Sequence, residues 1–209
     1  LKHVSTISCN NDKYLGDIIS EAYEKVGKDG VVLMEESETR DTHVELTEGV
    51  QFDCGLTSPH FITNKDKQLS ELDNPLILIC ASEIPNIRKI QKVLEHVIKK
   101  GRSLLIIAPV AQQVKSALLM NKVKGNIKVN IINAPTYGVN KQETLSDLCL
   151  LTGAALINED LGDDMDIIQP EHLGRCNSSI TSQHETILKV NTNESVDEMI
   201  KLLEKELRE

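Results

Sequence analysis

The sequence predicts an α/β protein in which β-sheets are flanked by helices. Two apolar runs, LILIC at 76–80 and LLIIA at 104–108, are continuous rather than alternating, as is typical of strands covered on both faces. The segments that follow them, 85–100 and 109–122, carry apolar residues at helical spacing. With 209 residues and 40% hydrophobic content, the chain is long enough to bury a substantial core.

Net charge, apolar run length and cysteine content limit the classes of partner. The net charge is −9 and no basic run has interleaved aromatic residues, so a nucleic-acid partner is not expected. No apolar run approaches the roughly 20 residues of a membrane helix, so no membrane partner is expected either. The five cysteines form no CxxC pair, which predicts neither a disulfide framework nor a zinc site and fits a reducing compartment. The chain opens without a methionine or a signal-peptide pattern, so we expect that a targeting sequence is absent or already removed, or that the chain is an excised fragment.

The first 47 residues are expected to form a small base. Segment 4–8 is predicted to be a strand, and residues 10–12 then supply capping side chains for a helix that ends at Gly27. The apolar residues at helical spacing in that helix are Leu15, Ile18, Ile19, Ala22 and Val26. The Lys-Asp-Gly sequence at 28–30 predicts a tight turn before a strand at 31–35.

The stretch 48–64, EGVQFDCGLTSPHFITN, contains both phenylalanines, Phe52 and Phe61, of a chain that is only 2% aromatic. Gly49 at its start is expected to act as a hinge, and Pro59 argues against an uninterrupted central strand. We interpret the stretch as a broken extended segment that presents a functional surface. A bulged edge strand with a phenylalanine in the core would account for either residue equally well.

The two central helices differ in how their apolar residues are distributed. On 85–100 these residues form one broad stripe, wide enough to serve both a core and an exposed edge. On 109–122 they occupy two opposite sides. One side comprises Val110, Val114, Ala117 and Leu118, and the other comprises Leu119, Met120 and Val123. Because a surface helix needs one apolar side for its own core, the second side indicates a partner, a ligand or another layer, and a helix inside a three-layer domain would look the same.

The rest of the chain continues the alternation of strands and helices. The expected elements are a strand at 127–132, a turn at 134–138, a helix at 141–151, strands at 154–157, 176–180 and 186–190, a turn at 170–173, and a helix from 194 to the end. The acidic run at 158–166 lacks the regular ligand spacing of a calcium loop, so a solvated loop is expected and no metal site is predicted.

A search for catalytic motifs is negative. The chain contains no GxSxG, no P-loop, no GxGxxG and no HExxH sequence, and no catalytic residue is predicted. Cys54 and His60 lie close enough in sequence for a thiolate and its base, but nothing in the sequence lowers the pKa of the thiol. An enzyme that uses this pair is therefore kept only as an alternative.

Several segments together carry a family resemblance. EGVQFDCGLTSPHFI closely resembles EGMQFDRGYLSPYF, the start of the apical domain of group I chaperonins, the Hsp60 family of bacteria and organelles. KVGKDGVV, which precedes this stretch, also resembles the family sequence. The resembling segments that follow it, in the family's order, are NIRKIQKVLEHVIKKGRSLLIIA, KVKGNIKV, NAPTYG and LTGAALINEDLG. The resemblance implies part of an intermediate domain at 1–47 and an apical, swivelling domain at 48–209.

The resemblance also implies a function and a site. In the family, the apical domain binds non-native polypeptides in a groove between two helices and an extended segment, and the same groove receives the mobile loop of the Hsp10-type co-chaperonin. The corresponding positions here are Leu56, His60, Phe61, Gln91, Leu94, Lys115, Leu119 and Met120, with Gly49 at the apical hinge. ATP and Mg²⁺ would bind in an equatorial domain that is not part of this sequence, so the chain itself is expected to be no enzyme and to hold no cofactor. Sister subunits would form a ring, expected to be heptameric.

The chain departs from the family pattern at several positions. Leu56 and His60 stand where tyrosines are usual, and Gln91 and Lys115 replace aliphatic residues. Cys54 replaces an arginine that makes an inter-subunit ion pair in relatives. A scaffold-type subunit with reduced client binding is therefore a second alternative. The sequence SPHFITNKDK favours an organelle as the location of the subunit, either a mitochondrial matrix or a plastid-type stroma.

Overall fold

The computed structural model describes residues 1–27, 30, 32, 34, 41–44, 46, 49–134, 140–165 and 168–190. It divides into two compact units, Leu1–Glu48 and Gly49–Glu209, and the division lies one residue beyond the boundary expected from the sequence. Most of the strand expected at 31–35, most of the turn expected at 134–138, and the helix expected from 194 onward lie outside the described residues.

Unit 1 contains two packed helices, α1 (Lys2–Ser8) and α2 (Lys13–Val26). The start of α2 is fixed by Asp12, whose carboxylate accepts hydrogen bonds from the amides of Tyr14 and Leu15 at 2.9 and 3.2 Å. Its end is followed by Gly27, whose φ of 83° suits glycine. The helix predicted from residues 10–12 to Gly27 is therefore confirmed.

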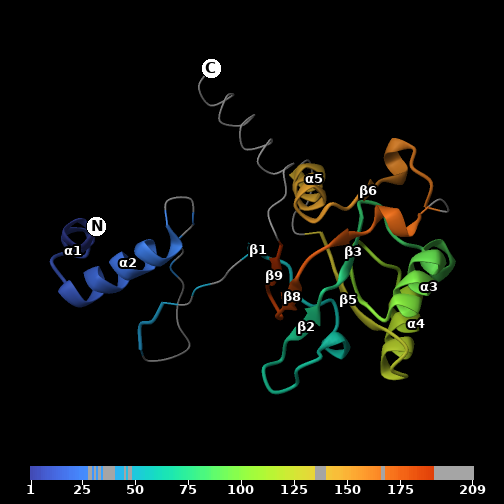
Figure 1. Cartoon of the computed structure of the whole chain (residues 1–209), viewed down its shortest axis with the longest axis horizontal. Helices are drawn as coiled ribbons and strands as arrows, with labels where there is room; N and C mark the ends of the chain where they lie inside the picture. Colours follow the sequence, from blue (N-terminus) through green and yellow to red (C-terminus); the bar gives the residue numbers. More distant parts are fainter. Residues whose placement is uncertain are drawn as a thin grey trace. The chain divides into compact units, whose positions relative to one another are not determined.

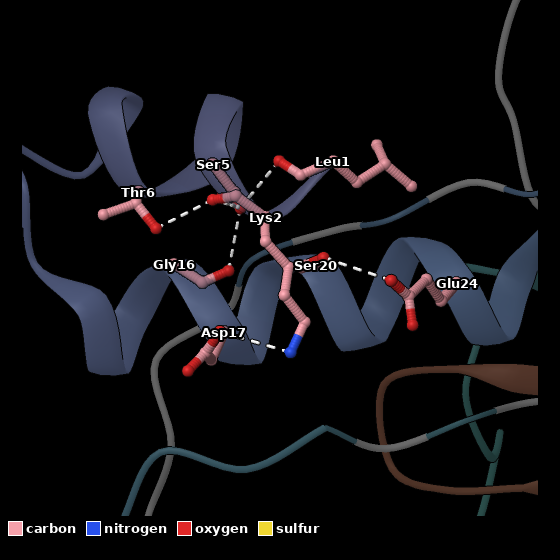
Figure 2. A network of polar contacts seen from close by, with 8 residues as sticks. All are labelled: Leu1, Lys2, Ser5, Thr6, Gly16, Asp17, Ser20 and Glu24. Atoms are coloured by element: carbon pink, nitrogen blue, oxygen red, sulfur yellow. Dashed lines mark hydrogen bonds and ion pairs between the residues drawn. The ribbon is translucent and has the colours of Figure 1, made fainter.

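The strand predicted at 4–8 is wrong, because this segment belongs to α1. Two hydroxyl residues of this segment, Ser5 and Thr6, make hydrogen bonds within the helix pair instead (Figure 2). Thr6 Oγ1 donates to the carbonyl of Lys2 at 2.7 Å, and Ser5 Oγ donates to the carbonyl of Gly16 on α2 at 2.8 Å. The helices approach closely because Gly16 has no side chain, and a Cβ at that position would lie 2.7 Å from the Cα of Thr6.

Unit 2 is built on two sheets (Figure 1). The first is antiparallel, has the order β1-β9-β8-β2, and consists of β1 (Val50–Phe52), β2 (Ser70–Asp73), β8 (Ser178–Thr181) and β9 (Thr186–Lys189). The second has the parallel order β5-β4-β3-β6, with β7 antiparallel to β3. Its strands are β3 (Leu76–Cys80), β4 (Ser103–Ile107), β5 (Lys128–Ile132), β6 (Leu156–Ile157) and β7 (Gly174–Arg175).

The parallel sheet is covered on both faces, which is the physical reason for its unbroken apolar strands. Leu78, Leu104 and Ile106 face the core beneath α3 (Gln91–Lys100) and α4 (Gln112–Val123). Ile79 and Leu105 face the opposite core, which α5 (Asn140–Thr152) and the antiparallel sheet complete. The predicted α/β class, with helices flanking sheets, is confirmed.

Two helices begin later than the sequence suggested. The segment expected to be helical from residue 85 first forms a 3-10 turn, Ile87–Ile90, and α3 starts at Gln91. The segment expected from residue 109 is extended at first, because Val110 pairs with Ile84 in a parallel bridge, and α4 starts at Gln112. These bridging residues tie the chain before α3 to the chain before α4.

Candidate functional site

Helices α3 and α4 lie next to each other on one face of the parallel sheet (Figure 1). α3 connects β3 to β4 and α4 connects β4 to β5, so two successive crossovers place both helices on the same face. Their inner sides are anchored by buried side chains, Val93 and Val97 from α3 and Val114 and Leu118 from α4. We define the α3–α4 surface as the outward side chains of these two helices together with segment 56–62.

Apolar side chains remain accessible on the α3–α4 surface. On α4, Met120 is 61% exposed and Val123 is 83% exposed, while Leu119 is half-buried against the core. On α3, Ile98 is 51% exposed and Leu94 is half-buried. The second apolar side predicted for α4 is therefore open to solvent rather than sealed inside a layered domain.

Ile98 and Val123 were not among the predicted contact residues. A signal for both was present in the sequence, because Ile98 follows Leu94 and Val123 follows Leu119 by four positions, which is one helical turn. The structure extends each apolar stripe by that turn toward the C-terminal end of its helix.

Segment 56–62 runs along the edge strand β5. Leu56 forms an antiparallel bridge with Ile132, and Thr57 Oγ1 donates to the carbonyl of Ile131 at 2.8 Å. The chain then makes a 3-10 turn, Pro59–Phe61, in which the predicted residue His60 is exposed. The broken extended segment expected from the sequence is thus present beside the two helices.

The prediction that Phe61 contacts a partner needs correction. Its side chain is fully buried and belongs to the core beneath α3 and α4. The 3-10 turn points the ring inward, so Phe61 supports the α3–α4 surface from below. Of the two interpretations left open by the sequence, the core position holds for this residue, while Phe52 on β1 is half-buried.

Lys122 joins the end of α4 to segment 56–62. Its Nζ donates to the carbonyls of His60 and Ile62 at 2.8 and 3.1 Å and lies 5.7 Å from the centroid of the Phe61 ring. Partial burial lowers the pKa of Lys122. Nothing in the sequence marked this residue, because the carbonyls that it binds are about 60 positions away.

The N-terminal ends of the two helices are also fixed. The side-chain amide of Gln113 on α4 donates to the carbonyl of Pro85 at 2.7 Å. The amide of Ile84 donates to the carbonyl of Pro109 at 2.9 Å, and the amide of Ala111 donates to the carbonyl of Ile84 at 3.1 Å. The α3–α4 surface is thereby held at both ends by contacts that leave its apolar side chains unengaged.

Two predicted polar residues also lie on this surface. Gln91 is exposed, and its amide donates to the carboxylate of Glu95 one turn along α3 at 2.9 Å. Lys115 is half-buried on α4, one turn before Leu119. The predicted positions on α3 and α4 are thus brought to one side of the sheet, and His60 is held at the end of α4 by Lys122.

Gly49 and Gly55 are required by backbone geometry. Gly49, the predicted hinge, has a φ of 129°, and a Cβ there would collide with the carbonyl of Leu188 on β9. A Cβ at Gly55 would collide with the carbonyl of Gln183. These close approaches explain the glycines at both positions, and the hinge role of Gly49 stays a prediction.

Cys54 is placed unlike a catalytic thiol. Its Sγ donates to the carbonyl of Asn133 at 3.1 Å, and burial raises the pKa of the thiol. A nucleophilic cysteine requires the opposite shift, toward the thiolate. The geometry therefore gives no support to a mechanism in which His60 activates Cys54.

The described residues show no metal cluster and no membrane-spanning helix. Within the described residues, no three His, Cys, Asp or Glu side chains are placed to hold a metal ion. None of the helices in that part of the chain has the length and apolar character to cross a membrane. No model of a known protein family matches the chain.

Proposed function

We propose that the unit beginning at Gly49 captures non-native polypeptides, as the apical domain of a 60 kDa group I chaperonin does. The observation that carries this proposal is α4, whose inner side chains Val114 and Leu118 are buried while Met120 and Val123 on its other side are exposed. An unfolded chain displays apolar side chains in no fixed order, so its receptor needs accessible and adaptable apolar groups. The flexible thioether of Met120 suits this role.

In this proposal the α3–α4 surface receives an amphipathic helix or an extended strand of the client. The contact residues are Leu56, His60, Gln91, Leu94, Lys115, Leu119 and Met120, extended by Ile98 and Val123, with Phe61 beneath them. The same surface would receive the mobile loop of an Hsp10-type co-chaperonin. Residues 1–47 would be part of an intermediate domain, and Gly49 the hinge between the two domains.

The remaining parts of the proposal concern the full-length subunit. It would bind ATP and Mg²⁺ in a domain outside this chain, assemble with sister subunits in a ring of seven, and act in an organelle matrix or stroma. The 209-residue chain alone would hydrolyse no ATP. Support for these points comes from the resembling segments and their order along the chain, from KVGKDGVV to LTGAALINEDLG.

Capture of a chemically denatured model protein by the 209-residue chain tests the proposal. Leu94→Ser and Leu119→Ser should each weaken binding roughly fivefold, because a half-buried leucine loses about 1 kcal/mol of apolar contact with the client. Leu161→Ser is the matched control, because this leucine is 72% exposed on another element, the 3-10 turn Glu159–Leu161. Equal binding by all three variants, or no capture by the unmodified chain, contradicts the proposal.

A scaffold-type subunit with weak client binding is the second candidate. The observation that favours it is the exposed Gln91–Glu95 pair, which makes the beginning of α3 polar. This candidate predicts binding of a co-chaperonin loop peptide without capture of denatured protein. Gln91→Leu would then create client binding that the unmodified chain lacks.

A further inference from the structure

Charge is distributed very unevenly along this chain. Residues 86–128, which include α3 and α4, contain ten Lys and Arg residues and a single acidic residue, Glu95, for a net charge of +9. The rest of the chain contains 13 Lys and Arg and 31 Asp and Glu residues, for a net charge of −18. The overall value of −9 therefore conceals a strongly cationic segment.

More than half of the cations in this segment are exposed to solvent. Six of them are exposed, namely Arg88, Lys92, Lys99, Lys100, Lys124 and Lys128. Two ion pairs between described residues, Lys2–Asp17 and Lys25–Glu21, lie in unit 1. Within the described part of the chain, none of the six exposed cations has a carboxylate partner.

Neighbouring cations contribute to the lowered pKa of His96 on α3. Burial is the largest cause that lowers the pKa of this imidazole, and the positive charges of Lys100, Arg175 and Lys99 lower it further. A protonated imidazole at this position is thus disfavoured first by burial and then by three nearby cations.

Helix stability does not account for the full set of cations. Lys99 and Lys100 occupy the last turn of α3, and Lys122 occupies the last turn of α4, where positive charge interacts favourably with the helix dipole. Lys92, however, lies in the first turn of α3, where the dipole disfavours a cation, and neither helix has an acidic residue in its first turn. The helix dipole therefore does not explain the positive charge at the start of α3.

Cations and accessible apolar side chains occur next to each other in the sequence of both helices. Exposed Ile98 lies directly before Lys99, and exposed Val123 lies between Lys122 and Lys124. A partner that covers this surface must bury aliphatic groups and place charge at their border. Residues 86–128 contain no Phe, Tyr or Trp, and Phe61 of segment 56–62 is buried, so these residues offer no exposed Phe, Tyr or Trp on which the bases of single-stranded nucleic acid could stack.

We propose that the α3–α4 surface selects acidic amphipathic segments of polypeptide and rejects basic ones. This inference rests on the proposed function and names its substrate class. An acidic amphipathic helix would place its apolar side chains against Leu94, Ile98, Leu119 and Val123 and its carboxylates against the surrounding lysines. A basic helix with the same apolar side chains would meet like charge, so the cations discriminate by repulsion as well as by attraction.

The test uses two synthetic peptides that share one helical leucine stripe and carry either Glu or Lys on the polar side. Binding to the 209-residue chain is measured by fluorescence anisotropy at about 0.01 M and about 0.15 M ionic strength, between which the Debye length falls from about 30 Å to about 8 Å. The Glu peptide should bind about tenfold more tightly than the Lys peptide at low salt, and the difference should shrink at the higher salt.

The second experiment reverses the charge of two lysines on α3. The double variant Lys92→Glu with Lys99→Glu should remove or invert the preference for the Glu peptide. The control variant, Lys65→Glu with Lys67→Glu, changes two exposed lysines outside the segment and should leave the preference intact. Both substitution sites of the test variant are exposed, so its fold should be retained, which circular dichroism checks.

Each result has a distinct meaning. Equal binding of the two peptides overturns the charge selection and leaves the proposed capture function standing. Binding of neither peptide by a chain that captures denatured protein also overturns the selection, whereas failure to capture any client overturns the proposed function. Tighter binding of a single-stranded oligonucleotide or of anionic lipid vesicles than of the Glu peptide overturns the inference in favour of a phosphate-bearing partner.

Discussion

Replacing Lys122 by methionine removes the ammonium group that joins α4 to segment 56–62 and keeps most of the aliphatic stem. Two hydrogen bonds to the carbonyls of His60 and Ile62, at 2.8 and 3.1 Å, are lost, together with the contact 5.7 Å from the centroid of the Phe61 ring. The 3-10 turn should then open more often. The apolar side chains of α4 remain unchanged, so the variant separates the position of the segment from the composition of the surface.

The change in the stability of the 3-10 turn in Lys122→Met is the difference between two opposing contributions. A hydrogen bond to a charged group stabilises by about 1.5–3 kcal/mol, and a cation over an aromatic ring at an exposed site adds about 0.5–1 kcal/mol. Against this, the ammonium of Lys122 is partly desolvated, as its lowered pKa indicates, and the freed carbonyl of exposed His60 regains water. We expect a net loss of about 1 kcal/mol, which corresponds to a roughly fivefold increase in local opening.

Hydrogen exchange measures this opening directly. The amides of Phe61 and Ile62 donate to the carbonyls of Ser58 and Pro59 at 3.1 and 3.2 Å, so both should exchange about fivefold faster in Lys122→Met. The melting temperature should fall by about 2–4 °C. Lys124→Met is the matched control, because Lys124 is exposed just after α4. Unchanged exchange at Phe61 and Ile62 in Lys122→Met would refute the positioning role.

Three further predictions concern the core, the thiols and one glycine. Leu118→Ala should destabilise the protein by about 2–5 kcal/mol in urea unfolding, because this side chain is fully buried, whereas Val123→Ala on the exposed side should cost less than about 0.5 kcal/mol. Burial raises the pKa of Cys80, Cys149 and Cys176 from the ordinary value of 9.0 to about 12, so between these pH values the folded state retains protons that the unfolded state loses. The free energy of unfolding should therefore fall as the pH rises from about 9 to about 12. A free energy of unfolding that does not change over this pH range would contradict the burial of these thiols. Gly55→Ala should cost about 1–3 kcal/mol by thermal unfolding, because the new Cβ meets the carbonyl of Gln183, and an unchanged melting temperature would show that this loop shifts freely.

Local signals in the sequence predicted most of the architecture. The runs at 76–80 and 104–108 identified β3 and β4 because strands covered on both faces need no polar positions. Asp12 identified the start of α2 and Gly101, with a φ of 62°, identified the end of α3, since capping depends on residues adjacent in the chain. The two-sided pattern of α4 identified its exposed stripe.

Features that depend on contacts between residues far apart in the chain could not be predicted from the sequence. Segment 4–8 has residues of high strand propensity, yet α1 forms because Gly16 of α2 allows close packing and accepts a hydrogen bond from Ser5. The burial of Phe61 depends on a 3-10 turn whose direction no local pattern fixes. Lys122 bridges two carbonyls from another element, and one lysine among 23 basic residues carries no mark of that role.

The net charge of the whole chain did not predict the charge that a partner meets on α3 and α4. A value of −9 is a sum over the whole chain, whereas charges in physiological salt act over about 8 Å, so a partner on α3 and α4 senses the local cations. A nucleic-acid partner was not expected for two reasons, this sum and the lack of a basic run with interleaved aromatic residues. Only the second reason applies to α3 and α4, because residues 86–128 contain no Phe, Tyr or Trp for stacking.

The combination of exposed apolar groups and like charge on the α3–α4 surface also has a consequence for self-association. Exposed aliphatic side chains such as Ile98, Met120 and Val123 would favour pairing of two copies through the same surface. Such pairing would bring Lys92, Lys99 and Lys124 of one copy against those of the other, and the repulsion opposes it. An acidic partner meets the same apolar groups without this repulsion. The cations therefore allow the surface to stay apolar and exposed, and they restrict which chains can cover it.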